Sequence, residues 1–205
     1  MTSLKSGVKM GLMKKLSTYL FLILFSFSAP SFADDIRDFE IEGISVGDSL
    51  LDYFEEEEIK KAELNYYNDN EFVPVYIEDE NKFSNYSGVQ FHYKNSDENF
   101  KIFSIEGIIW FKNNFDGCIK KQKEIDEELK TMFPNTERQI SGIKSHRQDK
   151  SGKSKFSGID YFFQTGDITS ITCYDWTKKM KHPDNLRVGI ITEEFQTWIN
   201  TKAYE

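Results

Sequence analysis

Short stretches of this chain alternate between apolar and polar residues, and a period of two is typical of β-strands with one buried face. Residues 95–99 and 165–167 have the composition of tight turns, so the segments on either side of each are expected to form hairpins. The alternation predicts strands at residues 39–46, 73–77, 89–94, 101–111, 159–164, 168–176 and 186–192.

Apolar residues at steps of three and four predict one long helix in the middle of the chain, over residues 116–133. Ile125, Leu129 and Met132 form its apolar stripe, and Pro134 ends it because proline cannot continue a helix. We expect this stripe to pack on one face of the sheet.

Two shorter helices are predicted on either side of the strands. The first begins at a cap on Ser49 and runs to about Ala62, with a break near Glu55 as the alternative, and the second covers residues 193–199. Residues 135–156 show neither period and predict a polar connection. The chain is therefore expected to be α+β, an antiparallel sheet packed against a long middle helix and shorter terminal helices.

The first 33 residues have the pattern of an export signal. Lys14 and Lys15 precede an apolar run at 16–27, and small residues stand before a cleavage point between Ala33 and Asp34. The run is shorter than the roughly 20 residues that span a bilayer. We therefore predict a periplasmic or secreted protein with this division of the chain: residues 1–33 as signal peptide and residues 34–205 as a single α+β domain.

The net charge of the chain limits the classes of partner that it is expected to bind. It has 34 Asp and Glu against 26 Lys and Arg, a net charge of −8, and loss of the first 33 residues removes four lysines and leaves −12. An acidic mature chain argues against nucleic acid or an anionic membrane as partner. No later apolar run is long enough for a membrane span, so an unidentified protein or small molecule is the expected partner.

The chain has two cysteines, Cys118 and Cys173. Cys118 lies seven residues before Ile125 and so on the apolar side of the middle helix, and Cys173 shares a strand face with Ile171. A helix packed on a sheet brings such positions together, and an exported protein with one pair is expected to form a disulfide. The alternatives are two free buried thiols and a redox-active pair.

Gly47-Asp48-Ser49-Leu50 matches the signature of the GDSL hydrolases, in which the serine is the nucleophile. That family also needs a late Asp-x-x-His, and neither His146 nor His182 has an Asp three residues before it. A serine without a histidine base is not activated. We therefore interpret Ser49 as a turn and helix cap and keep a Ser49 esterase as the alternative.

Neither a metal ion nor a cofactor is expected. The Glu55–Glu58 run lacks the spaced ligands of a calcium loop, and His92, His146 and His182 lie in separate segments without ligand spacing. Tyr66 and Tyr67 lie in a polar segment, where they either stack on a sugar or peptide or close a satellite apolar cluster.

The opening Ile41–Phe54, Gly-Ile-Ser-Val-Gly-Asp-Ser-Leu-Leu-Asp-Tyr-Phe at its centre, resembles a group of small exported proteins from marine alphaproteobacteria. The likeness continues through the middle helix with its cysteine to Trp198–Tyr204. It implies export and a Gram-negative setting and brings no activity with it. The predicted function is non-catalytic binding or interaction, with the Ser49 esterase and a structural component of the envelope as alternatives.

Overall fold

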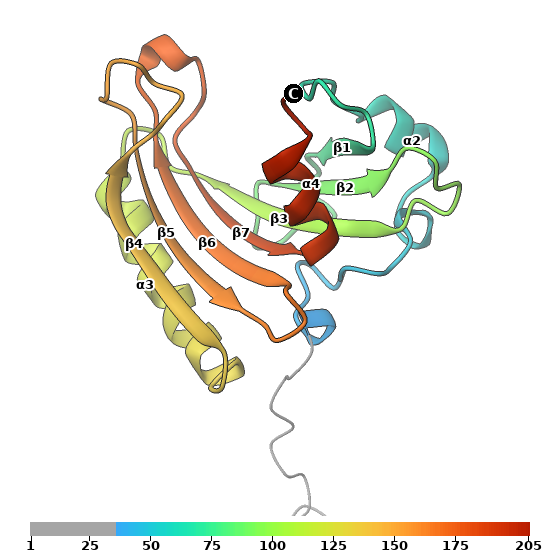
Figure 1. The fold of residues 1–205 in the computed structure, drawn as a ribbon, viewed down its shortest axis with the longest axis horizontal. Helices are drawn as coiled ribbons and strands as arrows, with labels where there is room; N and C mark the ends of the chain where they lie inside the picture. Colours follow the sequence, from blue (N-terminus) through green and yellow to red (C-terminus); the bar gives the residue numbers. More distant parts are fainter. Residues whose placement is uncertain (1–35) are drawn as a thin grey trace, which may run out of the picture. The chain divides into compact units, whose positions relative to one another are not determined.

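The computed structural model describes residues 36–205, and the predicted signal peptide lies outside them. The described chain is α+β, with one antiparallel sheet in the order β1-β2-β3-β7-β6-β5-β4 (Figure 1). The strands are β1 (Phe72–Ile77), β2 (Gly88–Lys94), β3 (Ile102–Trp110), β4 (Glu137–Ser145), β5 (Lys155–Phe162), β6 (Ile168–Asp175) and β7 (Asn185–Ile191). The α-helices within this range are α2 (Glu56–Lys61), α3 (Phe115–Met132) and α4 (Glu193–Thr201). None of these helices has the length and apolar character that a membrane span requires.

The longest described helix, α3, and the C-terminal helix, α4, lie on opposite faces of the sheet (Figure 1). The disulfide joins α3 to Cys173 of β6, while Phe195 of α4 contacts the ring of His92 in β2, on the other side. We call the face under α3 the packed face and the opposite one the open face. Residues along each strand alternate between the two faces, so the register assigns every strand residue to one of them.

The main core lies on the packed face. The N-terminal segment and α2 cover β1–β3 there, and α3 covers β5–β7. The apolar residues that meet in this layer include Leu50, Phe54, Ile59, Phe91, Ile105, Cys118, Leu129, Ile171 and Val188. A second, smaller cluster lies under α4 on the open face and contains Phe72, Phe195, Trp198 and Ala203, with Tyr67 packed against it. Tyr67 therefore joins a satellite apolar cluster, as one of the two interpretations predicted.

The strand predicted at residues 39–46 is wrong. Ile41 and Ile44 pair only with each other, across a tight turn in which Glu42 and Gly43 have φ of 55° and 77°. Their side chains are buried, so the alternation came from apolar residues of a turn that anchor it in the core. The helix predicted from Ser49 is divided into a 3₁₀ turn at Leu50–Asp52 and α2, and the break falls at Glu55.

A strand replaces much of the polar connection predicted at 135–156. Strand β4 forms one edge of the sheet and pairs with β5, with an irregularity between Ile140 and Gly142. Ile140 and Ile143 are 60 % and 61 % exposed, so their apolar character does not mark a buried face. The irregularity and this exposure together hide the period of two on which the prediction depended.

The apolar stripe predicted for the middle helix is only partly correct. Leu129 is buried, but Met132 is 38 % exposed. Two polar residues, Gln122 and Asp126, take the buried positions between Cys118 and Leu129. These side chains are buried because each has hydrogen-bond partners in the sheet.

Candidate functional site

Ser49 is committed to backbone hydrogen bonds. Its Oγ donates to the carbonyl oxygen of Asn99 at 2.5 Å and accepts from the amide of Leu51 at 3.2 Å, at the start of a 3₁₀ turn. All three histidines lie among the described residues, and none of them hydrogen-bonds to Ser49. The hydroxyl therefore acts as the predicted cap.

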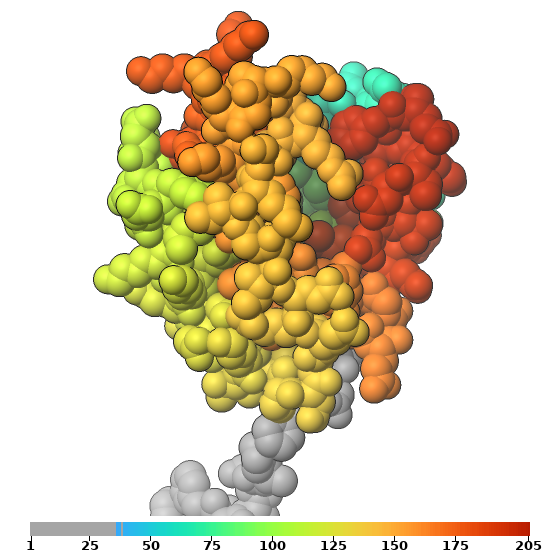
Figure 2. Space-filling model, turned by 60° about the vertical axis from the view of Figure 1, so that its left-hand side comes forward, coloured from blue at the N-terminus to red at the C-terminus, as the bar shows by residue number. Residues whose placement is uncertain are grey.

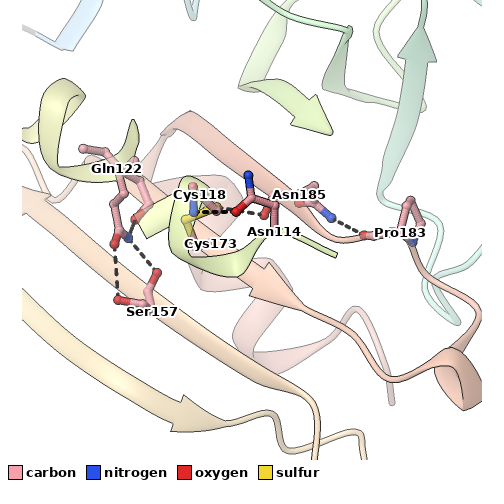
Figure 3. The surroundings of a disulfide bond; sticks show 9 residues. Asn114, Cys118, Gln122, Ser157, Cys173, Pro183 and Asn185 are labelled. Carbon is pink, nitrogen blue, oxygen red and sulfur yellow. Dashed lines mark hydrogen bonds between the residues drawn. A yellow bond between two sulfur atoms is a disulfide. The ribbon is translucent and has the colours of Figure 1, made fainter. Parts of the chain in front are cut away.

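The two cysteines form the predicted disulfide, with the sulfurs 2.04 Å apart (Figure 3). One turn along α3, the amide of Gln122 donates to the carbonyl oxygens of Ser157 and Ile171 at 2.7 and 2.8 Å. Both cysteines are fully buried. The pair therefore fastens the helix to the sheet on the packed face.

The open face carries a connected row of polar side chains near its centre. Arg187 of β7 forms an ion pair with Glu106 of β3 at 2.9 Å and lies 3.4 Å from Oε1 of Gln90 in β2. The Gln90 amide donates to the Tyr66 hydroxyl at 2.9 Å. The side chains of Arg187 and Glu106 keep 28 % and 18 % of their surface exposed, so the pair can be reached from solvent.

Beyond Gln90 the row ends in a buried histidine. His92 Nε2 lies 3.1 Å from the Tyr67 hydroxyl and 3.3 Å from the Gln90 amide nitrogen, and its Nδ1 has no partner among the described residues. Burial, and after it the charge of Arg187, lowers the pKa of His92 to about 3. This imidazole therefore stays neutral at physiological pH and supports the row from beneath α4.

A second carboxylate faces the same surface from β5. Asp160 lies opposite Ser170 of β6, which lies opposite Gly189 of β7, which in turn lies opposite Glu106. Asp160 has no hydrogen-bond partner in the described part of the chain, and burial raises its pKa. It is thus a carboxylate that the protein's own groups leave available.

Small residues form the floor between the two carboxylates. A side chain on Gly189 would place its Cβ 2.8 Å from Cγ of Glu106, so glycine leaves the space that Glu106 occupies. Ser170 and Thr172 of β6 and Gly158 of β5 are further small residues of this face. In Figure 2 the surface is hollowed between the β4–β5 segment in orange and α4 in red.

Tyrosine and tryptophan rings border this hollow. Burial, followed by the charge of Glu106, raises the pKa of Tyr174 to about 12, and the charge of Asp160 acts on the same hydroxyl. Tyr174 of β6 has the same register parity as Ser170 and Thr172, so it lies on the face that carries both carboxylates. The Tyr174 and Trp176 rings stack with centroids 5.6 Å apart and planes 8° from parallel.

Two histidines that the sequence leaves in separate segments meet at the end of this aromatic row. His146 and His182 lie 4.3 and 4.9 Å from Trp176, measured between ring centroids. Within residues 36–205, however, no group of three His, Cys, Asp or Glu side chains is placed to hold a metal ion.

Two other depressions of the surface have fewer interacting charged groups than the open-face hollow. One of about 680 Å³ is lined by Glu78, Glu80, Ser84, Asn85, Tyr86, Ser87 and Trp110. The other, of about 380 Å³, lies between the N-terminal segment and the start of α4 and includes Gly47, Lys101, Asp167 and Glu193. Neither contains an ion pair with an unpaired carboxylate beside it, so the open-face hollow is the better candidate.

Comparison of the chain with models of protein families, with curated proteins and with solved structures finds no match in any of the three. The function has to follow from the residues themselves.

The charged residues of the open face have a signal in the sequence, which the period of two does not reveal. Glu106 stands between Ile105 and Gly107, and Arg187 between Leu186 and Val188, so each is a charge inside an apolar strand. A charged residue of this kind needs a partner when its strand is central. The opposite signs of Glu106 and Arg187 could have paired them.

Proposed function

We propose that this protein is an exported binding domain, and that its ligand is a small neutral saccharide held in the hollow of the open face. The observation that carries the proposal is the partly exposed Arg187–Glu106 pair with the unpartnered Asp160 across a floor of small residues. Binding sites of this kind combine a concave surface with a few converging polar groups.

The charges of the hollow favour a ligand without net charge. Glu106 balances Arg187, and burial raises the pKa of Asp160 because it disfavours the charged form of that carboxyl. An anionic ligand would have to displace Glu106 from the guanidinium. A strongly cationic ligand would meet Arg187.

The shapes of the side chains favour vicinal hydroxyl groups. Guanidinium and carboxylate groups are planar and offer two donors or two acceptors at once, which suits neighbouring hydroxyls on a ring. Tyr66, which is 45 % exposed, and the partly buried Tyr174 supply aromatic surface for the apolar face of a sugar.

We expect the full chain, expressed in a Gram-negative host, to be recovered from the periplasmic fraction with Asp34 as its first residue. Recovery in the cytoplasm with residues 1–33 still attached would contradict this.

The binding proposal is tested by isothermal titration calorimetry. The purified protein is titrated with glucose, galactose, mannose, N-acetylglucosamine and maltotriose. At least one of them should bind, and Asp160→Asn should weaken it about tenfold, since hydrogen bonds to a charged group contribute about 1.5–3 kcal/mol. Asp52→Asn is the matched control, because Asp52 is exposed and lies in the 3₁₀ turn. Failure of all five sugars to bind at about 10 mM, or equal effects of the two variants, would contradict the proposal.

A further inference from the structure

The cations of this acidic protein are concentrated at one end of the sheet. Residues 144–155, at the turn between β4 and β5, and residues 175–184, between β6 and β7, are together called the basic tip. The basic tip has eight Lys and Arg against three Asp, whereas the rest of residues 36–205 has 14 Lys and Arg against 29 Asp and Glu. The net charge of the whole chain hides this polarity. The eight cations are Lys144, Arg147, Lys150, Lys153, Lys155, Lys178, Lys179 and Lys181.

None of these eight side chains forms an ion pair with a carboxylate in the described part of the chain. All eight residues are exposed. Two of the three carboxylates are used within the tip, since Asp149 accepts from the amides of Ser151 and Ser154, and Asp184 accepts from the amide of Trp176. The tip therefore presents an excess of positive charge to solvent.

The two segments of the tip are fastened to each other. Thr177 donates its backbone amide to the Ser154 hydroxyl at 3.0 Å and its own hydroxyl to Asp149 at 3.1 Å. The rings of His146 and Trp176 pack across the same junction. In Figure 2 both segments project from the upper end of the molecule. The cations are thus held on one projecting surface.

We propose that the basic tip docks this protein on an anionic phospholipid surface by contact with headgroup phosphates. Clustered Lys and Arg residues are attracted to anionic lipid, each by about 1 kcal/mol, within a Debye length of the membrane. The acidic remainder is repelled by the same surface, so the two effects together orient the molecule with its tip toward the lipid.

The shape of the tip favours a flat partner over a chain. The eight cations come from two separate chain segments and are all exposed, and none of them lines the two depressions at Glu78–Trp110 and at Gly47–Glu193. No large apolar side chain of the tip is exposed, and the contact is therefore electrostatic and does not insert into the hydrocarbon.

The test is sedimentation of the purified protein, expressed as the full chain, with vesicles of phosphatidylcholine alone or with about a third phosphatidylglycerol. Binding should require the anionic lipid and should be lost when NaCl is raised to about 0.5 M, because salt screens exposed charges. The double variant K178E/K179E should lower the partition coefficient at least tenfold.

The matched control is K120E/K123E, which makes the same change of charge on two exposed lysines of α3, outside the tip. It should bind almost as well as the original chain. Equal loss in both variants would mean that only net charge matters and would overturn the proposal. Binding to a polyanion such as heparin without any binding to anionic vesicles would also overturn the proposal, in favour of an anionic polymer as partner.

Discussion

Asp126 is a carboxylate on the buried side of α3, and side chains from two strands hold it there. Its oxygens accept from Nε and Nη2 of Arg138 at 2.7 and 2.5 Å and from the Tyr161 hydroxyl at 2.7 Å. We expect Asp126→Asn to lower the free energy of unfolding by about 2 kcal/mol, measured by urea denaturation, because hydrogen bonds to a charge are lost. Glu127→Gln, on the exposed side of the same turn, should change it by less than about 0.5 kcal/mol. Equal costs would contradict this role.

For Ser49 the sequence suggests two different roles, a helix cap and the nucleophile of an esterase. If it is a cap, Ser49→Ala should lower the free energy of unfolding by about 1 kcal/mol, measured by urea denaturation. The substitution should not change any rate of ester hydrolysis. Ser87→Ala is the control, since Ser87 is exposed and donates only its backbone amide. Labelling of Ser49 by a fluorophosphonate, with no change of stability in Ser49→Ala, would instead favour the esterase.

His92 makes the stability depend on pH. Its folded pKa of about 3 lies below the unfolded value of about 6.5, so protons bind the unfolded chain first as pH falls. Its contribution is complete above pH 6.5 and is lost as pH falls toward 3, with a slope of at most about 1.4 kcal/mol per pH unit. Between pH 6.5 and 5, the free energy of unfolding, measured by urea denaturation at each pH, should change less with pH for His92→Gln than for the original chain. Identical slopes would show that His92 is not buried in its neutral form.

At the scale of elements, the sequence predicts what has a strong period and misses what does not. The hairpins β2–β3 and β5–β6 and the helix α3 follow from period and turn chemistry. Strand β4 does not, because Gly142 has a φ of 64° beside an irregular pairing and Ile140 faces solvent. An edge strand has one neighbour, so its burial pattern is weak.

The candidate site was beyond sequence prediction for a related reason. Glu106, Arg187 and Asp160 come from three strands whose order in the sheet differs from their order in the chain. Each residue is readable as a charge in an apolar segment, but only the register shows that Gly189 and Ser170 separate the two carboxylates. Local pattern therefore identifies such residues without placing them together.

The disulfide is the element-scale link that the sequence did predict. It closes a segment with a sequence separation of 55 and fastens α3 to β6. On the chain-entropy account, the double variant C118S/C173S should have a free energy of unfolding about 4 kcal/mol lower than the original chain. The loss is measured by urea denaturation, in which the midpoint shifts to a lower urea concentration. Reduction of the original chain should give a similar shift and leave the double variant unchanged. A loss of less than about 1 kcal/mol would show that packing alone holds α3 in place.

At the scale of the whole described domain, the two faces of the sheet differ in composition. The packed face carries α3, the disulfide and most of the core, whereas the open face carries a balanced ion pair and an available carboxylate. The charge polarity adds a third surface, the basic tip, at the end of the same sheet. Most of the core and the disulfide thus lie on the packed face, and the proposed binding site lies on the open face.

The most direct test of the open face as the binding face is backbone NMR of the isotope-labelled protein during titration with the five sugars. We predict that the perturbed amides cluster on β3, β5, β6 and β7 around Glu106, Asp160, Tyr174 and Arg187. Perturbations that are absent, or that gather at Ser49 or around the disulfide, would contradict the account.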